Sequence, residues 1–196
     1  MKKLIGCFQI LTLILSMTEV SGQTPFGTQR LKKSDLFIDV APVSNVAWAE
    51  YLAFLKKEYG ENSAVCAAAL PDSLSAGSYY VYWQQHKCPV LAKTPVVGIS
   101  MEQAEAYAQW RTIAANIALE LRGKKYRVEY MLPTETVLQQ FYACQKRKIF
   151  KSSETKQELT SNRTITCWTA DGTLYFESYT KPDTLTVFRC MARLVK

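Results

Sequence analysis

The chain has 196 residues, 48% of them apolar and 21% charged, so it is long and apolar enough for one compact domain with a core. Eight Gly and seven Pro without a repeat exclude collagen-like and low-complexity architectures. The single histidine, His86, excludes His-rich zinc sites and leaves a Ser-His-Asp mechanism dependent on one residue. Composition therefore disfavours most hydrolase chemistry.

Residues 1–22 have the pattern of a secretory signal peptide. Lys2 and Lys3 precede an apolar stretch from Leu4 to Met17, and small residues follow near a cleavage point. A lipobox-like sequence ends at Cys7, but this cysteine precedes most of the apolar stretch, which argues against lipid attachment. We expect an exported protein (periplasmic, cell-surface or secreted) without a transmembrane span in the mature chain.

The charge balance is basic, with 24 Lys and Arg against 17 Asp and Glu. Loss of residues 1–22 removes two lysines and one glutamate and leaves a formal charge of +6. The basic clusters are far apart and interrupted by acidic residues, which is typical of solvated surface. The sequence predicts no nucleic-acid partner, although the charge is compatible with an acidic polysaccharide or a membrane surface. It sets no oligomeric state.

Five cysteines remain after signal removal, and export makes disulfides plausible. An odd number leaves one thiol over, and several pairings stay open. Proximity in the sequence suggests one bridge between the first two and a second among the last three. Their spacing matches no zinc signature, so we expect no metal there. The disulfide candidates are Cys66, Cys88, Cys144, Cys167 and Cys190.

Residues 23–59 are predicted to contain a tether, a strand and a helix. Residues 23–35 have the composition of a tether, and the folded domain is expected over 36–196. Leu36 to Val40 is predicted as a short strand. A helix follows that Ser44 or Asn45 can cap and Gly60 ends. Its apolar stripe, expected in the core, is Val46, Trp48, Tyr51, Leu52 and Leu55.

The aromatic run from Tyr79 to Trp83 is predicted as a strand, because the surrounding sequence has no sustained helical period. A strand packed on one side is the commoner interpretation, whereas an exposed cluster would form a binding surface. His86 is expected in an exposed loop. The candidate partner-binding residues are Tyr79, Tyr80, Tyr82 and Trp83.

A second helix begins at a capping box formed by Ser100 and Gln103 and ends near Gly123. A strand over 126–131 and a third helix opening at Pro133 come next, with the third helix directing four apolar side chains inward. The expected apolar face of the second helix is Ala104, Tyr107, Ala108, Trp110, Ile113, Ala114, Ile117 and Leu121; that of the third is Val137, Leu138, Phe141 and Tyr142.

The last third of the chain reads as β-rich. Residues 152–163 are polar and are expected to form an exposed loop. Asp171-Gly172 lies between two strand-like runs and indicates a hairpin. A final strand is predicted over 187–194. Helices followed by antiparallel strands indicate an α+β domain with two or three helices.

Four stretches carry motifs in a shared order. Thr94–Trp110 reads P-V-V-G-I-S followed by A-x-A-Y-x-x-W, Met131–Glu135 reads M-L-P-T-E, Phe188–Cys190 reads F-R-C, and Pro42–Asn45 precedes the first helix. Together they resemble the sulfatase-modifying-factor family, also called the formylglycine-generating enzyme family. The resemblance covers residues 36 to the end and implies a C-type-lectin-like fold in a shortened, divergent member.

Active members of this family oxidise a cysteine of a bound peptide to formylglycine, using copper(I) held by two cysteine thiolates that lie a few residues apart. The corresponding stretch, residues 162–187, contains only Cys167 and lacks the family's R-G-G-S segment. The resemblance therefore implies a missing oxidase site and no cofactor. The family's calcium-binding segment falls in the same shortened region, so no metal ligand is carried over.

The resemblance also bears on the disulfides. The family's F-R-C cysteine pairs with a cysteine of the second helix, and that position is Ala108 here. Cys190 has therefore lost that partner. Cys144 lies close to another family half-cystine, so the resemblance implies a rearranged bridge from Cys144 to Cys167 or Cys190.

Three functions follow as hypotheses. The first is an exported, non-catalytic module that binds a protein or glycan partner in the cell envelope, where gliding-motility and secretion lipoproteins use this domain. The alternative is a copper-dependent formylglycine-generating oxidase in which Cys167 and Cys190 meet in space. The third is a hydrolase or oxidase centred on His86 and Glu135, although Glu135 has a ready structural role at the start of a helix.

Overall fold

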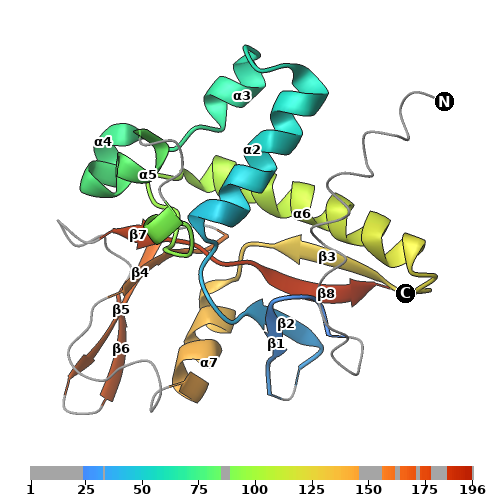
Figure 1. The fold of residues 1–196 in the computed structure, drawn as a ribbon. Coiled ribbons are helices and arrows are strands. Elements are labelled where there is room, and N and C mark those ends of the chain that lie inside the picture. The colour runs from blue at the N-terminus through green and yellow to red at the C-terminus, as the bar shows by residue number, and fades with distance from the viewer. Residues whose placement is uncertain are drawn as a thin grey trace.

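A computed structural model of the chain describes residues 24–32, 34–84, 89–145, 156–161, 164–170, 173–177 and 185–195. The predicted signal peptide, residues 1–22, and His86 lie outside these residues. The described part contains two four-stranded sheets and three long helices, together with several short ones (Figure 1). The expected α+β class is therefore confirmed.

The first sheet has the order β1-β2-β8-β3, and all its neighbours are antiparallel. This sheet joins both ends of the described chain, because its last strand, β8, pairs with β2 near the N-terminal end. Its strands are β1 (Thr28–Arg30), β2 (Leu36–Asp39), β3 (Arg127–Met131) and β8 (Met191–Val195).

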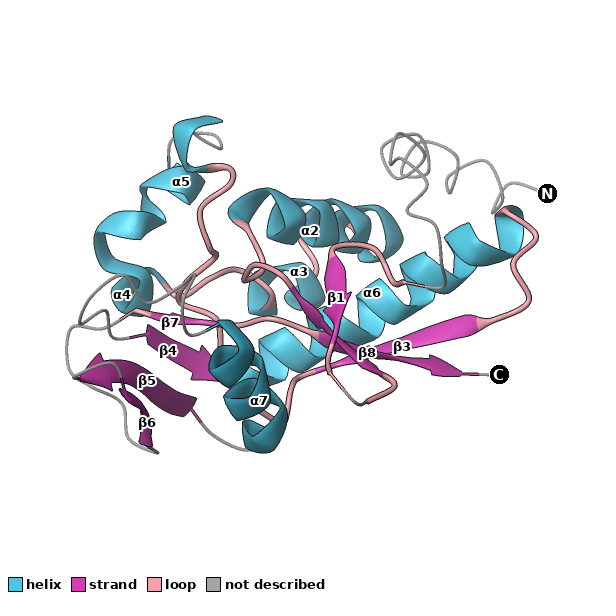
Figure 2. Ribbon diagram, turned by 90° about the horizontal axis from the view of Figure 1, so that it is seen from below, coloured by secondary structure: helices cyan, strands magenta, loops and turns pink. Residues whose placement is uncertain are grey.

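The second sheet has the order β6-β5-β4-β7 and stands apart from the first in both views (Figures 1 and 2). β5 and β6 pair with Ala170 opposite Thr173, so the predicted hairpin is confirmed. Its strands are β4 (Lys156–Leu159), β5 (Thr164–Ala170), β6 (Thr173–Glu177) and β7 (Thr186–Val187).

The three long helices are α2 (Asn45–Tyr59), α6 (Met101–Leu121) and α7 (Glu135–Gln145), which agree with the predicted set. Between α2 and α6 the described residues form short helices, and we call residues 61–84 and 89–92 the helical excursion. These are α3 (Ala64–Ala68), α4 (Ser73–Ala76), η1 (Gly77–Tyr80), α5 (Val81–Gln84) and η2 (Pro89–Leu91).

The ends of α2 and α6 follow the predicted chemistry. The Ser44 Oγ accepts a hydrogen bond from the Ala47 N–H, and Gly60, with φ of 90°, ends α2. At α6, the Ser100 Oγ accepts from the Gln103 N–H while the Gln103 Oε1 accepts from the Ser100 N–H. These side chains satisfy backbone donors that have no partner within a helix.

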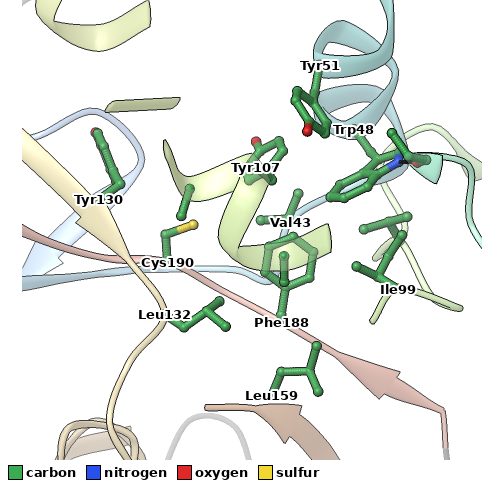
Figure 3. Packing of buried hydrophobic residues seen from close by; sticks show 14 of the residues in the cluster. Val43, Trp48, Tyr51, Ile99, Tyr107, Tyr130, Leu132, Leu159, Phe188 and Cys190 are labelled. Atoms are coloured by element: carbon green, nitrogen blue, oxygen red, sulfur yellow. Dashed lines mark hydrogen bonds between the residues drawn. The ribbon is translucent and has the colours of Figure 1, made fainter. Parts of the chain in front are cut away.

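Two hydrophobic clusters lie on opposite faces of the first sheet. Because successive strand residues point to opposite faces, Phe37 joins the larger cluster with α2 and α6, and Ile38 joins the smaller one with α7. In the larger cluster the Trp48 ring stacks on Tyr107 with centroids 5.4 Å apart and meets Phe188 edge-on at 5.9 Å (Figure 3).

The β3 edge of the first sheet is closed by side chains of α6. Asn116 donates from Nδ2 to the Val128 carbonyl and accepts at Oδ1 from the Val128 N–H, both at 2.9 Å. Thr112 Oγ1 accepts from the Tyr130 N–H at 2.8 Å. These contacts replace the hydrogen bonds of a missing neighbouring strand, so this edge does not offer free backbone groups at these two positions.

Three segments differ from their sequence-based interpretation. Residues 23–35 do not form only a tether, because β1 pairs with β2 and Leu31 is buried. Residues 152–163 are not simply an exposed loop, since β4 lies there and pairs with both β5 and β7. The predicted final strand over 187–194 is interrupted at residues 188–190. The first two segments are too polar to indicate a strand on their own, and pairing with distant strands decides their conformation.

Candidate functional site

The Phe188–Cys190 segment, which separates β7 from β8, is the centre of the buried polar structure. Arg189 is 3% exposed, and its Nε and Nη2 donate to the two carboxylate oxygens of Glu158 at 2.8 and 2.7 Å. Its Nη1 donates to the Asp39 carbonyl at 2.8 Å. Arg189 therefore joins β4 of the second sheet to β2 of the first.

Aromatic side chains of α7 complete the Arg189 site. The Tyr142 hydroxyl donates to the Glu158 carboxylate, and the guanidinium carbon of Arg189 lies 4.5 Å from the centroid of the Phe141 ring. Glu158 is 2% exposed. A buried pair of this kind is tolerated only when its remaining donors and acceptors are also satisfied, as they are here.

A second ion pair lies beside the first. Arg111 of α6 donates from Nη1 and Nη2 to the two carboxylate oxygens of Asp39 at 2.6 and 2.9 Å. Its Nη2 also donates to the Phe26 carbonyl, and its guanidinium lies over the Tyr130 ring at 4.1 Å. The Cys190 N–H donates to the same Asp39 carboxylate at 2.9 Å.

We call Asp39, Arg111, Glu158 and Arg189 the buried ionic network. Its four members come from β2, α6, β4 and the segment before β8, which are distant in sequence. All four are paired through charge-assisted, two-point hydrogen bonds, the strongest polar contacts available to these side chains. Within the described residues the four charged side chains are paired with one another, and the pairs link elements that are distant in sequence.

The sequence analysis missed this network. The signals that could have found it are charged residues within otherwise apolar stretches, because such residues are rarely buried unless they are paired. Asp39 ends an apolar strand and Arg111 interrupts the apolar face of α6. Glu158 gave no such signal, since its neighbours are polar.

Cys190, a candidate copper ligand in the oxidase hypothesis, is fully buried beside this network. Figure 3 shows its side chain between Tyr130 and Tyr107, pointing toward α6. Burial raises the pKa of the thiol to about 12, against the opposing effect of Arg111. A protonated, enclosed thiol is poorly suited to act as a thiolate ligand.

Cys167, the second candidate ligand, is a residue of β5 in the second sheet, opposite Phe176 of β6. Cys190 precedes β8 in the first sheet, and the two sheets occupy different parts of the molecule (Figure 2). Cys167 therefore lies within a strand of the second sheet, whereas Cys190 lies in the segment that leads from β7 to the first sheet.

Cys66, Cys144 and Cys190 are free thiols in the structure, so the proposed bridges that involve them are not formed in it. Cys66 is buried, and its Sγ donates to the Gly60 carbonyl at 3.3 Å, so it closes the turn after α2 as a small core residue. Cys144 is exposed on α7. Cys88 lies outside the described residues.

The aromatic run from Tyr79 to Trp83 was predicted as a strand, and this prediction is wrong: η1 and α5 cover it. Tyr82 is 2% exposed and packs edge-on against Trp83 with centroids 4.7 Å apart, so Tyr82 belongs to the interior. Tyr80 and Trp83 are half-buried, and the side chain of Tyr79 lies outside the described part. A run of adjacent aromatics carries neither helical nor strand periodicity, so tertiary packing sets its conformation.

The helical excursion is fastened to the core at several points. Gln103 donates from Nε2 to the Ala68 and Leu70 carbonyls at 2.7 and 2.9 Å, and Trp48 Nε1 donates to the Ala69 carbonyl at 3.1 Å. Gly98, with φ of 73°, packs so closely that an added Cβ would lie 2.5 Å from the Asp72 carbonyl oxygen. The excursion is therefore a fixed surface feature.

Glu135, a candidate of the third hypothesis, has a structural position in the described part of the chain. Glu135 is the first residue of α7 and accepts a hydrogen bond from the Gln139 Nε2 at 3.1 Å, which fits its predicted structural role. Within the described ranges, no group of three or more His, Cys, Asp or Glu side chains could hold a metal ion. No helix in that same part of the chain combines the length and the apolar character needed to cross a membrane.

These features define an α+β domain in which two buried arginine–carboxylate pairs join α6 to β2 and the segment before β8 to β4. The sequence matches the family described as "Sulfatase-modifying factor enzyme 1-like domain" over residues 14–183, most of its length. The chain belongs to this family, which confirms the resemblance that the motifs indicated. The match ends shortly before the Phe188–Cys190 motif. Comparison with curated proteins and with solved structures gave no match.

Proposed function

We propose that this chain is an exported, non-catalytic member of its family that binds a protein or glycan partner in the cell envelope. The environment of Cys190 carries the proposal. This thiol is sealed in the core, its pKa is raised to about 12, and the only other cysteine of the C-terminal region, Cys167, lies within a strand of the second sheet. Copper(I) requires soft ligands that approach it together, and this arrangement is unfavourable for that geometry.

The helical excursion is the proposed partner-binding surface. From residue 62 to residue 84 it contains one charged residue, Asp72, in a chain that is 21% charged. Depletion of charge is the compositional mark of the centre of protein interfaces. Tyr80 and Trp83 are half-buried there, and Leu74 is 90% exposed. The fastening described above fixes the backbone around residues 68–72 of the excursion, and a backbone that is already ordered loses less entropy on binding.

Copper(I) titration of the reduced protein tests the absence of catalysis. We expect no stoichiometric binding that depends on Cys167 or Cys190 when a chelator competes for the metal. Cys144→Ser is the control, because an exposed thiol binds soft metals adventitiously. One copper ion per chain, lost in both Cys167→Ser and Cys190→Ser, would establish the oxidase alternative.

Substitution within the excursion tests the binding surface. Immobilised wild-type protein is expected to retain a component of the cell-envelope fraction. Immobilised Tyr80→Ala and Trp83→Ala variants are expected not to retain it. Tyr59→Ala is the matched control, since this tyrosine is 59% exposed on α2. The variants must keep the thermal unfolding midpoint of the wild type; if they only unfold the protein, these residues are structural and the proposed surface is wrong.

A further inference from the structure

One end of the first sheet collects basic residues that are far apart in the sequence. The turn between β1 and β2, the end of β8 and the start of β3 all lie at this end, because Leu36 is opposite Arg193 and Arg127 is opposite Val195. The turn from α6 into β3 reaches the same end. We call its exposed cations the basic end: Arg193 with Arg30, Lys32, Arg122, Lys124, Lys125 and Arg127.

The charge of the basic end is a local excess. The described residues contain equal numbers of Lys plus Arg and of Asp plus Glu, 13 of each. Seven of these cations lie at the basic end, together with three acidic residues, Asp35, Glu120 and Glu129. The basic end therefore has a formal surplus of four positive charges, and the rest of the described residues have an equal negative surplus.

Two of the three acidic residues already have a partner within the basic end. Arg30 Nη2 donates to the Asp35 carboxylate, and Arg193 Nε donates to the Glu129 carboxylate, both at 2.6 Å. Both ion pairs are exposed to solvent. The positive surplus is therefore densest in the turn into β3, where residues 122–127 include four cations and no acidic residue.

Stabilisation of α6 explains only part of this charge. Cations near the last turn of a helix interact favourably with its C-terminal carbonyls, and the effect falls off within that turn. Arg122 is the C-cap of α6 and occupies such a position. Arg30 and Lys32 lie in β1 and in the turn after it, and β2 and β8 separate β1 from β3. The helix end therefore does not account for the cations on that side of the sheet.

Exposed apolar side chains lie among these cations. Leu121, the last residue of α6, is 62% exposed, and Val195, the last residue of β8, is 40% exposed and lies opposite Arg127. Cations beside apolar side chains suit the surface of an anionic bilayer, where the cations meet the headgroups and the apolar groups enter the region below them. An acidic polysaccharide would satisfy the cations but leave Leu121 and Val195 in water.

We propose that the basic end is a surface that binds an anionic lipid bilayer. Electrostatic attraction to a membrane extends only over about 8 Å at physiological salt, so the local surplus acts rather than the charge of the whole chain. Figures 1 and 2 both show the end of α6 and the start of β3 on the opposite side of the molecule from α4 and α5. Binding through the basic end leaves the helical excursion open, so this inference goes beyond the proposed function and does not depend on it.

Vesicle co-sedimentation tests the proposal. The protein, purified as the cell produces it, is mixed with vesicles of equal parts phosphatidylglycerol and phosphatidylcholine. Vesicles of phosphatidylcholine alone measure binding by apolar parts of the chain that need no charge. We expect stronger binding to the anionic vesicles, and this excess should fall as salt is added, because salt screens the attraction. Equal binding to both kinds of vesicle would overturn the proposal.

Removal of two lysines locates the surface. The double variant Lys124→Gln with Lys125→Gln should bind anionic vesicles about 30-fold more weakly, from the usual contribution of a basic residue near an anionic surface. Lys56→Gln with Lys57→Gln is the matched control, because these adjacent, exposed lysines also lie at the end of a helix, α2, and their loss changes the net charge equally. The control should bind like the wild type, and equal losses in the two double variants would contradict the assigned surface.

Leu121→Ser separates a bilayer from an acidic polysaccharide. It should weaken binding to anionic vesicles by about 3-fold to 10-fold, because the burial of part of a leucine side chain is lost. Leu74→Ser is the control and should have no effect, since Leu74 is 90% exposed but lies on α4. The same proteins are passed over immobilised alginate. Retention of the wild type by alginate but not by anionic vesicles, or vesicle binding that Leu121→Ser leaves unchanged, would overturn the proposal.

Discussion

The two sides of α6 have different surroundings, and we call them its buried half and its exposed half. Ala104, Tyr107, Ala108 and Ala118 lie on the buried half, whereas Ile113 and Leu121 are more than half exposed. At 3.6 residues per turn, Ile113 points about 180° away from Ala104. Apolar periodicity therefore identified the helix correctly, but the side that the core covers determined which of its apolar residues are buried.

The largest expected loss of stability comes from breaking the buried ionic network, which lies beside the buried half of α6. Asp39→Ala leaves the Arg111 guanidinium and the Cys190 N–H without their carboxylate partner. Loss of one member of a buried pair costs about 3–5 kcal/mol in unfolding free energy. Chemical denaturation measures this loss. Asp35→Ala is the control, because its exposed carboxylate pairs with Arg30 at the surface, and an equal loss in both variants would contradict the assigned role.

A smaller effect is expected at the junction between the two halves. Asn116→Ala removes both side-chain hydrogen bonds to the Val128 backbone and reopens the β3 edge. We expect a loss of about 1–3 kcal/mol, the cost of leaving polar groups unsatisfied. Amide hydrogen exchange at Val128 should also accelerate. Gln109→Ala, at an exposed position of α6, should leave that amide unchanged.

Alkaline pH should lower the free energy of unfolding, because the buried Cys190 thiol then loses its proton more readily in the unfolded chain. Because the pKa of Cys190 is raised by burial from 9.0 to about 12, the folded state holds a proton that the unfolded chain releases above pH 9. The stabilising contribution is complete below pH 9 and is lost as pH rises toward 12. One pH unit above the unfolded pKa this group costs about 1.4 kcal/mol. Denaturation at pH 8 and pH 10 under reducing conditions should show that extra loss in the wild type but not in Cys190→Ala.

The smallest effect is expected on the exposed half. Ile113→Ser should change the stability of the monomer by about 0.5 kcal/mol or less, as is usual for surface positions. Tyr107→Ala, one side chain in the buried half, should cost about 3–5 kcal/mol. Thermal unfolding at low protein concentration gives both values, and a large loss in Ile113→Ser would mean that this residue packs within its own chain.

Local sequence signals predicted the elements whose chemistry is local. The Ser100–Gln103 capping box and the Gly60 end of α2 each act within a few residues, and the structure contains the corresponding helix ends. The strands on either side of Asp171-Gly172 pair as predicted, although these two residues lie outside the described part. The family motifs lie in these same elements, so they predicted the fold class as well. They carried less information about function, because sites vary independently of the scaffold.

The candidate site was less predictable, because its parts are distant in sequence. Arg189 belongs to a motif that the sequence analysis singled out, but its partner Glu158 lies in a polar segment interpreted as a loop. The aromatic run near Tyr82 was assigned the wrong structure for a similar reason. Pairing and packing over long sequence separations select among conformations that local preferences leave nearly equal in energy.

By itself the sequence determined the class of this domain, its long helices, its principal turns and the family to which it belongs. Tertiary structure alone decided that the F-R-C cysteine is enclosed by Arg111 and Asp39, that Tyr82 is an interior residue and that half of an apolar helix face is left at the surface. The physical reason is that capping and periodicity act over a few residues, whereas burial and ion pairing depend on which distant segments the fold brings together.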